Sequence, residues 1–203
     1  MKKNEFAILT IEDMNNRGFG VAHAEDGRVV FVQNAVTGET VNAKYIKIAK
    51  DYAVARVEKT LTPTDRRIPA DCNAFPACGG CVYRHISYEE ELKIKQQRVE
   101  DAVKRIGGID IKANPIVSDR NTMGYRNKAQ YPVAKDKNGN YIIGFYAPKT
   151  HRVIHAIDCP LAKRGFSDIL YTLKSIFEEL SISVYNEETG TGLIRHIYLR
   201  AND

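Results

Sequence analysis

Four cysteines constrain the fold of this 203-residue chain more than any other feature. Cys72, Cys78 and Cys81 lie close together, whereas Cys159 follows Cys81 only after 77 intervening residues. If all four thiols ligate one centre, two segments that are remote in sequence must meet, and a long loop is closed. We therefore expect one site that joins the early cysteine segment to Cys159.

The spacing of the cysteines bears on the kind of centre. Cys78 and Cys81 enclose Gly79-Gly80, whose amides can turn toward the sulfurs and stabilise a thiolate cluster. A proline directly follows Cys159, as it follows some cluster ligands. Structural zinc also accepts four cysteines but usually takes paired Cys-x-x-Cys units. The spacing favours an iron–sulfur cluster over zinc, with unligated structural thiols as a third alternative.

The bulk composition is that of an ordinary globular protein, with 43% hydrophobic and 27% charged residues. No apolar run approaches the roughly 20 residues needed to cross a bilayer, so no membrane association is expected. Two lysines near the start are not followed by an apolar segment, unlike in a signal peptide. We expect a cytoplasmic monomer, in which cysteines act as ligands rather than as disulfides.

Residues 1–60 are predicted to form a small β-barrel. Segments rich in Val, Ile, Thr and aromatic residues occur at 6–11, 29–32, 40–46 and 53–57, with turn residues between them. Short strands at this density favour a closed barrel, because closure removes exposed sheet edges. We expect a five-stranded barrel of the oligonucleotide-binding type.

Residues 61–109 are predicted to hold a boundary, the cysteine segment and a helix. Two prolines in the polar stretch 62–69 mark the boundary. Ser87 is the expected N-cap of the helix, and Glu90 stands where it completes a capping box. Gly107-Gly108 is the expected end. Four apolar residues share one helical face: Leu92, Val99, Val103 and Ile106.

Residues 110–203 are predicted to form an α+β domain, which makes the whole chain a mixed β and α+β protein. Strands at 125–134 and 141–146 flank Asn138-Gly139, a strong hairpin signal. Apolar residues at helical spacing from Phe166 to Leu180 indicate a helix that faces the core. Further strands are expected at 182–185 and 193–199.

Basic residues are concentrated between Arg120 and Arg164. This stretch contains nine Lys or Arg and only two acidic residues, Asp136 and Asp158. Tyrosines are interleaved with them: Tyr125, Tyr131, Tyr141 and Tyr146. This combination is typical of surfaces that follow a polyanion and stack its bases, although tyrosines at such positions also serve as strand core. The net charge of +5 agrees with an acidic partner. The candidate RNA-binding residues are Tyr125, Arg126, Asn127, Lys128, Arg195 and His196.

These motifs together resemble the N-terminal portion of the bacterial S-adenosylmethionine-dependent 23S ribosomal RNA uracil-5-methyltransferases. The run Gly-Phe-Gly-Val-Ala at 18–22 resembles the TRAM domain of that family, a small RNA-binding β-barrel. The cysteine segment at 72–81, followed by Arg84-His85, is similar to the family's cluster motif. Residues 124–128 and 158–160 resemble its central domain, and Arg195-His196 resembles the closing strand of that domain.

The resemblance implies a 4Fe–4S cluster on Cys72, Cys78, Cys81 and Cys159. It also implies that the barrel and the central domain recognise RNA and present a uridine, whose carbon 5 receives the methyl group. In the family, a cysteine of a C-terminal domain attacks carbon 6 of a flipped-out uracil. The chain shows no glycine-rich loop for S-adenosylmethionine and no fifth cysteine. We expect no catalytic and no methyl-donor-binding residue here, and no methylation by this chain alone.

Two other functions remain as alternatives. One is a stand-alone RNA-binding protein with a structural metal, and the other is an iron–sulfur redox sensor. A strand-like run continues almost to the last residue, which fits a chain cut off before its catalytic domain. Large-subunit ribosomal RNA is the target that the resemblance implies, and related enzymes act on transfer RNA.

Overall fold

The computed structural model describes residues 1–202, which fall into two compact units. Unit 1 comprises Met1–Ala70 and Val82–Val117, and unit 2 comprises Asp71–Cys81 and the chain from Ser118 onward. The stretch at 61–109, expected as one segment, is therefore divided: its helix belongs to unit 1 and its cysteine loop to unit 2. Within the described residues, no helix is long and apolar enough to cross a membrane.

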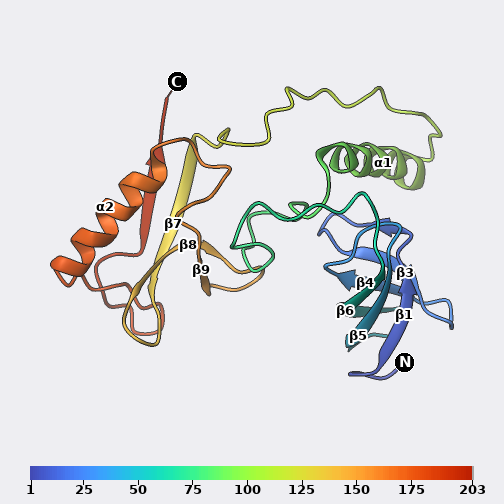
Figure 1. Ribbon diagram of the computed structural model, residues 1–203, viewed down its shortest axis with the longest axis horizontal. Coiled ribbons are helices and arrows are strands. Elements are labelled where there is room, and N and C mark those ends of the chain that lie inside the picture. The colour runs from blue at the N-terminus through green and yellow to red at the C-terminus, as the bar shows by residue number, and fades with distance from the viewer. Residues whose placement is uncertain (203) are drawn as a thin grey trace. The chain divides into compact units, whose positions relative to one another are not determined.

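Unit 1 contains a six-stranded sheet in the order β1-β5-β6-β4-β3-β2 (Figure 1). Only the β4–β6 pair is parallel. β1 also lies against β3, as in a sheet that curls toward closure. The strands are β1 (Phe6–Thr10), β2 (Asp13–Met14), β3 (Gly20–His23), β4 (Val29–Gln33), β5 (Thr40–Ile48) and β6 (Tyr52–Thr62).

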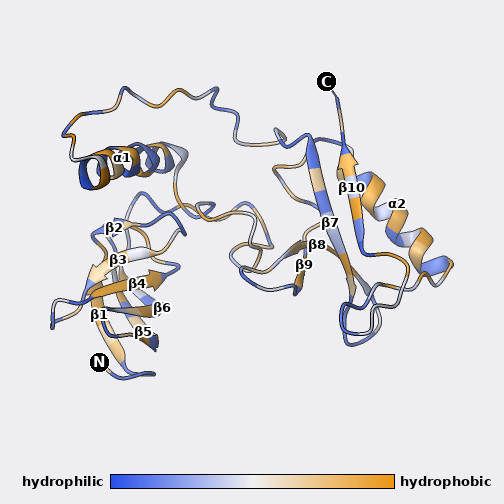
Figure 2. Ribbon diagram, turned by 180° about the vertical axis from the view of Figure 1, so that it is seen from behind, coloured by the Kyte–Doolittle hydropathy of each residue, from blue (hydrophilic) through white to orange (hydrophobic). Residues whose placement is uncertain are grey.

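Alternation of side chains explains why these segments form a half-buried sheet. In β4, Val30 and Val32 point into the core, and in β5, Val41 and Ala43 do the same, while the intervening residues face outward. All four predicted segments are strands. Figure 2 shows β4 as one of the most hydrophobic strands of this sheet.

The sheet has six strands where five were expected, because the two-residue β2 joins its edge. The sequence also did not indicate β3, since Gly20 and Ala22 have little intrinsic preference for strands. Their small size is a packing requirement. A Cβ atom at Gly20 would lie 2.7 Å from Cγ2 of Ile11 and 2.9 Å from Cβ of Ala35, closer than atoms pack.

Helix α1 (Tyr88–Gly107) begins and ends as predicted. The Ser87 hydroxyl accepts a hydrogen bond from the Glu90 amide at 3.3 Å, and Gly108 closes the helix with a φ of 68°. The second half of the capping box is absent, because the Glu90 carboxylate pairs with Arg66 at 3.3 Å and the Ser87 amide donates to the Arg66 carbonyl.

The predicted apolar face of α1 is not its buried face. Ile94 and Glu90 are the buried residues of the helix, whereas Val99 and Ile106 are 55% and 88% exposed. Glu90 is buried because its carboxylate has the Arg66 partner, which offsets the cost of removing charge from water. Contact with the rest of unit 1, which periodicity does not encode, decides which face is covered.

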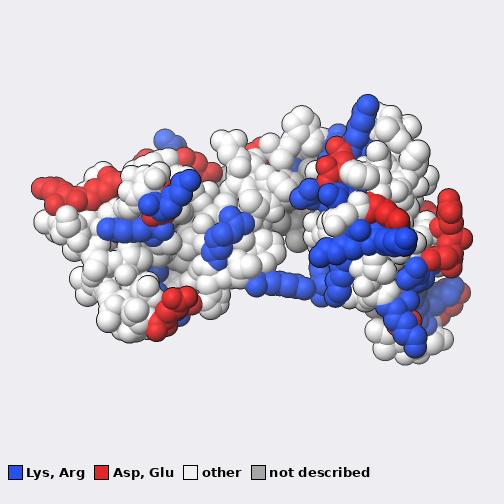
Figure 3. All heavy atoms as spheres, turned by 90° about the horizontal axis from the view of Figure 1, so that it is seen from below, with Lys and Arg blue, Asp and Glu red and all other residues white. Residues whose placement is uncertain are grey.

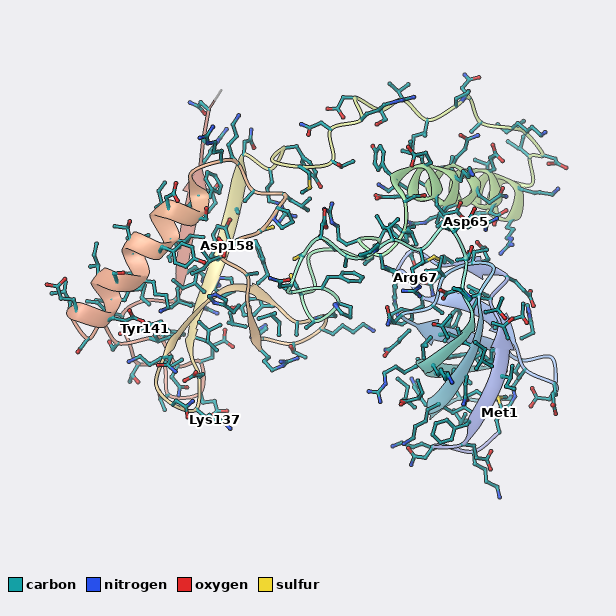
Figure 4. The ribbon with its side chains drawn as sticks, viewed as in Figure 1. Met1, Asp65, Arg67, Lys137, Tyr141 and Asp158 are labelled. Atoms are coloured by element: carbon teal, nitrogen blue, oxygen red, sulfur yellow. The ribbon has the colours of Figure 1, made fainter. Side chains whose placement is uncertain are left out.

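A buried ion pair anchors the chain that leads from the sheet to α1. Glu39 is fully buried and accepts hydrogen bonds from Nε and Nη2 of Arg67 at 2.6 and 2.9 Å. The Val36 amide also donates to Glu39, at 2.9 Å. Figure 4 labels Arg67 on this connecting segment. Arg67 donates two hydrogen bonds to the Glu39 carboxylate, and the Val36 amide donates a third. A buried charge is stable when it is paired and hydrogen-bonded in this way.

Unit 2 contains a four-stranded antiparallel sheet in the order β10-β7-β8-β9. Helix α2 (Phe166–Glu179) lies along this sheet (Figure 1), and Leu170 and Phe177 of α2 join its core. The strands are β7 (Lys128–Lys135), β8 (Tyr141–Tyr146), β9 (Val153–His155) and β10 (His196–Arg200).

The predicted hairpin and helix of unit 2 are confirmed. Lys135 pairs with Tyr141 across the hairpin, and Gly139 takes a φ of 86° in the turn, as Asn-Gly turns require. The other two predicted strands are shorter than expected. Only an isolated bridge joins Val184 to Ile194, and β10 begins at His196.

Candidate cysteine centre and RNA-binding faces

The loop at 72–81 is held against the end of β8. The Gly79 amide donates to the Tyr146 carbonyl at 2.9 Å, and a Cβ atom at Gly79 would lie 2.8 Å from that oxygen. Glycine is therefore needed for this approach. Within the loop, the Gly80 amide donates to Sγ of Cys78 at 3.3 Å, which is the amide–sulfur contact expected from the Gly-Gly pair.

Cys159 opens a turn that is fastened to the segment leading into β7. The Ala162 amide donates to the Cys159 carbonyl at 3.0 Å. The Pro160 carbonyl accepts from Gly124, and the Leu161 carbonyl accepts from Arg126 at 2.8 Å. These bonds place the Cys159 turn beside Arg126, whose guanidinium lies 5.5 Å from the centre of the Phe145 ring on β8.

The thiols interact electrostatically. Burial raises the pKa of Cys78, the Gly80 amide lowers it, the charges of Cys159 and Cys72 raise it, and Arg126 lowers it. Cys72 and Cys159 thus act electrostatically on Cys78, and all four cysteines belong to unit 2. We call the four residues Cys72, Cys78, Cys81 and Cys159 the cysteine centre.

The cysteine centre is not preformed for a single ion. Among residues 1–202, no three His, Cys, Asp or Glu side chains converge closely enough to hold one metal ion. A tetrahedral zinc site needs its sulfurs about 2.3 Å from one common point. The zinc and iron–sulfur alternatives for the cysteine spacing both therefore stay predictions.

A buried tyrosine belongs to the same region. Tyr131 of β7 has no exposed surface, and its hydroxyl has no hydrogen-bond partner among the described residues. Burial first, and then the charge of Cys159, raise the pKa of Tyr131 to about 12, while Arg126 opposes them. The sequence had suggested this tyrosine as a stacking platform, and the structure instead places it in the core of unit 2.

The predicted RNA-binding residues of unit 2 differ in exposure and in the groups they contact. Tyr125, Asn127 and Lys128 are exposed, and the Lys128 ammonium lies 5.6 Å from the ring centre of Tyr198 on neighbouring β10. Arg126 is different, because it is half-buried and acts on Cys78 and Tyr131.

Arg195 and His196 take part in a side-chain network. Arg195 donates to Glu187 at 2.8 Å and covers the Tyr185 ring, while Nε2 of His196 lies 3.1 Å from the Tyr146 hydroxyl. Glu187 also forms a hydrogen bond with His151 at 2.5 Å. The bonds from His151 and Arg195 both lower the pKa of Glu187, and the bond from His151 has the larger effect. Tyr146, His151, Glu187 and Arg195 of this network line an open cavity of about 660 Å³.

The outward face of the unit 1 sheet carries residues that the sequence analysis did not single out. Lys44 on β5 pairs with Phe6 on β1 and with Arg56 on β6, and its ammonium lies 5.8 Å from the Phe6 ring centre. Phe6 is 59% exposed. Tyr52 lies near Lys47, with the ammonium 5.3 Å from its ring centre. The sequence could have indicated these residues, because side chains alternate between the two faces along each strand and these occupy the outward positions.

We call this set, Phe6, Lys44, Lys47, Tyr52 and Arg56, the outer face of unit 1. Figure 3 shows Lys and Arg side chains gathered on unit 1 in the view from below. Exposed rings beside cations on one sheet face are the arrangement with which proteins stack bases and neutralise phosphates.

Comparison with known proteins agrees with the fold. Residues 8–57 match the TRAM domain model, which covers the sheet of unit 1 from Ile8 in β1 to Val57 in β6. An uncharacterised RNA methyltransferase of Clostridium tetani is 37% identical over 200 residues, and one of Bacillus cereus is 36% identical over 201 residues. Each match covers 98% of this chain and 43% of the relative.

A solved structure shares the fold. It is the Pyrococcus abyssi tRNA (uracil-54, C5)-methyltransferase in complex with S-adenosyl-L-homocysteine, with a TM-score of 0.67 and 24% identity. The match covers 95% of this chain and 42% of that one. The chain thus contains a TRAM domain and is related along almost all its length to RNA methyltransferases, while it spans less than half the length of the relatives it matches.

Proposed function

We propose that this chain is the RNA-recognising portion of an RNA uracil-5-methyltransferase, a cytoplasmic enzyme that transfers a methyl group from S-adenosylmethionine to carbon 5 of a uridine. The outer face of unit 1 is the observation that carries the proposal, because it sets the exposed Phe6 ring and the half-buried Tyr52 ring beside lysines on a sheet that the TRAM match covers from residue 8 to 57. Similarity to proteins named RNA methyltransferases supports the reaction class. We propose 23S ribosomal RNA as the substrate.

The exposed residues of unit 2 extend the proposed RNA contact. Lys128 and Arg200 are paired across β7 and β10, as are Gln130 and Tyr198, and all four side chains are exposed. Tyr125 is nearby in sequence. Together these residues offer aromatic rings, cations and an amide to single-stranded RNA. Arg126, in contrast, is assigned to the cysteine centre rather than to RNA.

We further propose that the cysteine centre holds a 4Fe–4S cluster. The donor set fits: four cysteines in one unit, an amide donating to Sγ of Cys78, and a buried Tyr131 hydroxyl without a partner among the described residues. Such a cluster would supply a covalent staple between the loop at 72–81 and the Cys159 turn. Closing this long loop restricts the unfolded chain and so stabilises unit 2.

The chain's own share of the reaction is recognition. The described residues include no glycine-rich strand–turn–helix that would cradle S-adenosylmethionine. We therefore propose that the 203 residues alone do not transfer a methyl group, and that their role is to bind RNA and present the uridine. Methyl transfer to uridine-containing RNA by the purified chain would contradict this part of the proposal.

The RNA-binding proposal is tested by salt-dependent binding to a uridine-containing RNA hairpin. Lys44→Ala should reduce the slope of log Kd against log salt by about one phosphate contact. Phe6→Ala should weaken binding by about 1–3 kcal/mol, the cost of losing one stacked base. The control is Lys174→Ala, which removes the same charge from α2, where Lys174 pairs with Glu178.

Equal effects of the Lys44 and Lys174 substitutions would show that only overall charge matters, and would remove the outer face of unit 1 as the binding surface. Unchanged affinity of the Phe6 variant would remove the stacking contact.

A further inference from the structure

We propose that the Tyr131 hydroxyl donates a hydrogen bond to the ligand sulfur of Cys159 when the cysteine centre holds its cluster. This hydrogen bond would tune the reduction potential of the cluster. This role deepens the proposed function and rests on the cluster proposed there. Tyr131 is in this view a positioning residue, because it acts on the ligand sulfur and not on RNA.

Burial gives the first argument. Tyr131 is fully buried in the core of unit 2, among Ala129, Ile143 and other apolar side chains, yet its hydroxyl has no partner among the described residues. A buried hydroxyl without a partner loses its bonds to water and gains nothing in return. Phenylalanine would fill the same space without that penalty, so the hydroxyl points to an acceptor that binds there.

A second buried tyrosine of the same sheet shows the usual arrangement. Tyr141 of β8 also belongs to the core of unit 2, but its hydroxyl donates to the Ile182 carbonyl. In Figure 4, Tyr141 lies apart from Asp158, the residue that precedes Cys159. Tyr141 thus has an acceptor for its buried hydroxyl, whereas Tyr131 has none among residues 1–202.

Packing places Tyr131 at the cysteine centre. Its ring lies 5.0 Å from that of Phe145, and Arg126 covers the same Phe145 ring at 5.5 Å. The backbone of Arg126 bonds the Cys159 turn, and the next residue of β8, Tyr146, receives the Gly79 amide of the cysteine loop. The Tyr131 ring therefore packs on a residue whose neighbours, Arg126 and Tyr146, bond the two segments that carry the cysteines.

The charges around the hydroxyl agree with this placement. The groups that act on it electrostatically are Cys159 and Arg126. A tyrosine hydroxyl can donate one hydrogen bond. A thiolate or sulfide of a cluster is an acceptor, and hydrogen bonds to such sulfurs are among the factors that set cluster potentials.

The sign of the effect follows from charge. One-electron reduction makes the cluster more negative, so a hydrogen bond to its sulfur stabilises the reduced form more than the oxidised form. Removing the donor should make reduction less favourable. The change can be measured without RNA and without methyl transfer.

The test is a redox titration, followed by electron paramagnetic resonance, of the 203-residue chain reconstituted with iron and sulfide in the absence of air. Tyr131→Phe should lower the equilibrium constant for one-electron reduction about tenfold, which is about 59 mV toward more negative potential. Tyr141→Phe is the matched control, because it removes a buried hydroxyl bonded elsewhere in the same core, and its potential should equal that of the wild type.

The outcomes separate the two proposals. Equal potentials for Tyr131→Phe and wild type, at equal iron content, would overturn the role of Tyr131 and leave the cluster in place. Failure of the wild-type chain to take up iron and sulfide would overturn the cluster and this role together. Thermal unfolding without iron, in which Tyr131→Phe should be no less stable than the wild type, shows that the variant folds.

Discussion

At the scale of single residues, burial decides the chemistry of the polar side chains. His85 follows the cysteine segment in sequence but lies in unit 1, where it is buried. Burial first, and then the positive charge of Arg67, lower the pKa of His85 to about 4, against the opposing effects of the Ala35 backbone and of Glu39. The folded protein therefore holds this imidazole neutral well below pH 6.5.

This property predicts a loss of stability in mild acid. Between pH 6.5 and about 4 the unfolded chain binds a proton at His85 that the folded chain does not, so the free energy of unfolding falls as the pH falls through this window. The loss by pH 4 is about 3 kcal/mol. Urea unfolding against pH measures it, and the imidazole resonances of His85 should titrate near 4.

His155→Asn serves as the control, because His155 is exposed on β9 and its removal should leave the pH dependence of unit 1 unchanged. An imidazole that titrates near 6.5 would contradict the burial of His85.

At the scale of elements, local sequence explains the ends of α1 better than it explains its packing. Ser87 caps the helix, and Glu89, Glu90 and Glu91 stand in its first turn, where they complement the helix dipole. The shared apolar face that the sequence indicates runs through Val99 and Ile106, which are exposed, while contact with unit 1 buries the charged Glu90.

The cap predicts a measurable contribution. Ser87→Ala should destabilise unit 1 by about 1 kcal/mol, because the Glu90 amide loses its acceptor. Ser175→Ala is the comparison, since the Ser175 hydroxyl bonds only the Tyr171 carbonyl within α2, and its effect should stay within about 0.5 kcal/mol. Urea unfolding followed by circular dichroism compares them, and equal effects would argue against the cap.

At the scale of the whole molecule, the chain enters unit 2 at Asp71, returns to unit 1 at Val82 and leaves it again after Val117. The cysteine centre, if it holds a cluster, joins the short insertion to the body of unit 2. Loss of one ligand should then affect unit 2 and spare unit 1.

Cys159→Ser should abolish the cluster and lower the unfolding temperature of unit 2. Opening a long cross-linked loop costs about 2–4 kcal/mol by analogy with a disulfide, or about 10–20 °C for a unit of roughly 100 residues. Calorimetry should show the transition of unit 1 unmoved. Asp158→Asn is the control, because it alters the neighbouring residue, whose carboxylate bonds the Tyr171 hydroxyl, and keeps the thiol.

The sequence by itself determined what depends on near neighbours along the chain. The caps of α1, the turn at Asn138-Gly139 and the strands β1, β4, β5 and β6 followed from local rules, since capping, turn chemistry and alternation act within a few residues. The TRAM-like motif also agrees with the match of residues 8–57 to the TRAM domain model, because such a motif is a pattern of sequence.

Only the tertiary structure decided which residues share a surface or a core. It placed the loop at 72–81 in unit 2, set Arg126 over the Phe145 ring, and buried Tyr131 with no partner for its hydroxyl among the described residues. It also assembled the outer face of unit 1 from strands that are distant in sequence. Each of these depends on contacts between residues far apart along the chain, which no local pattern records.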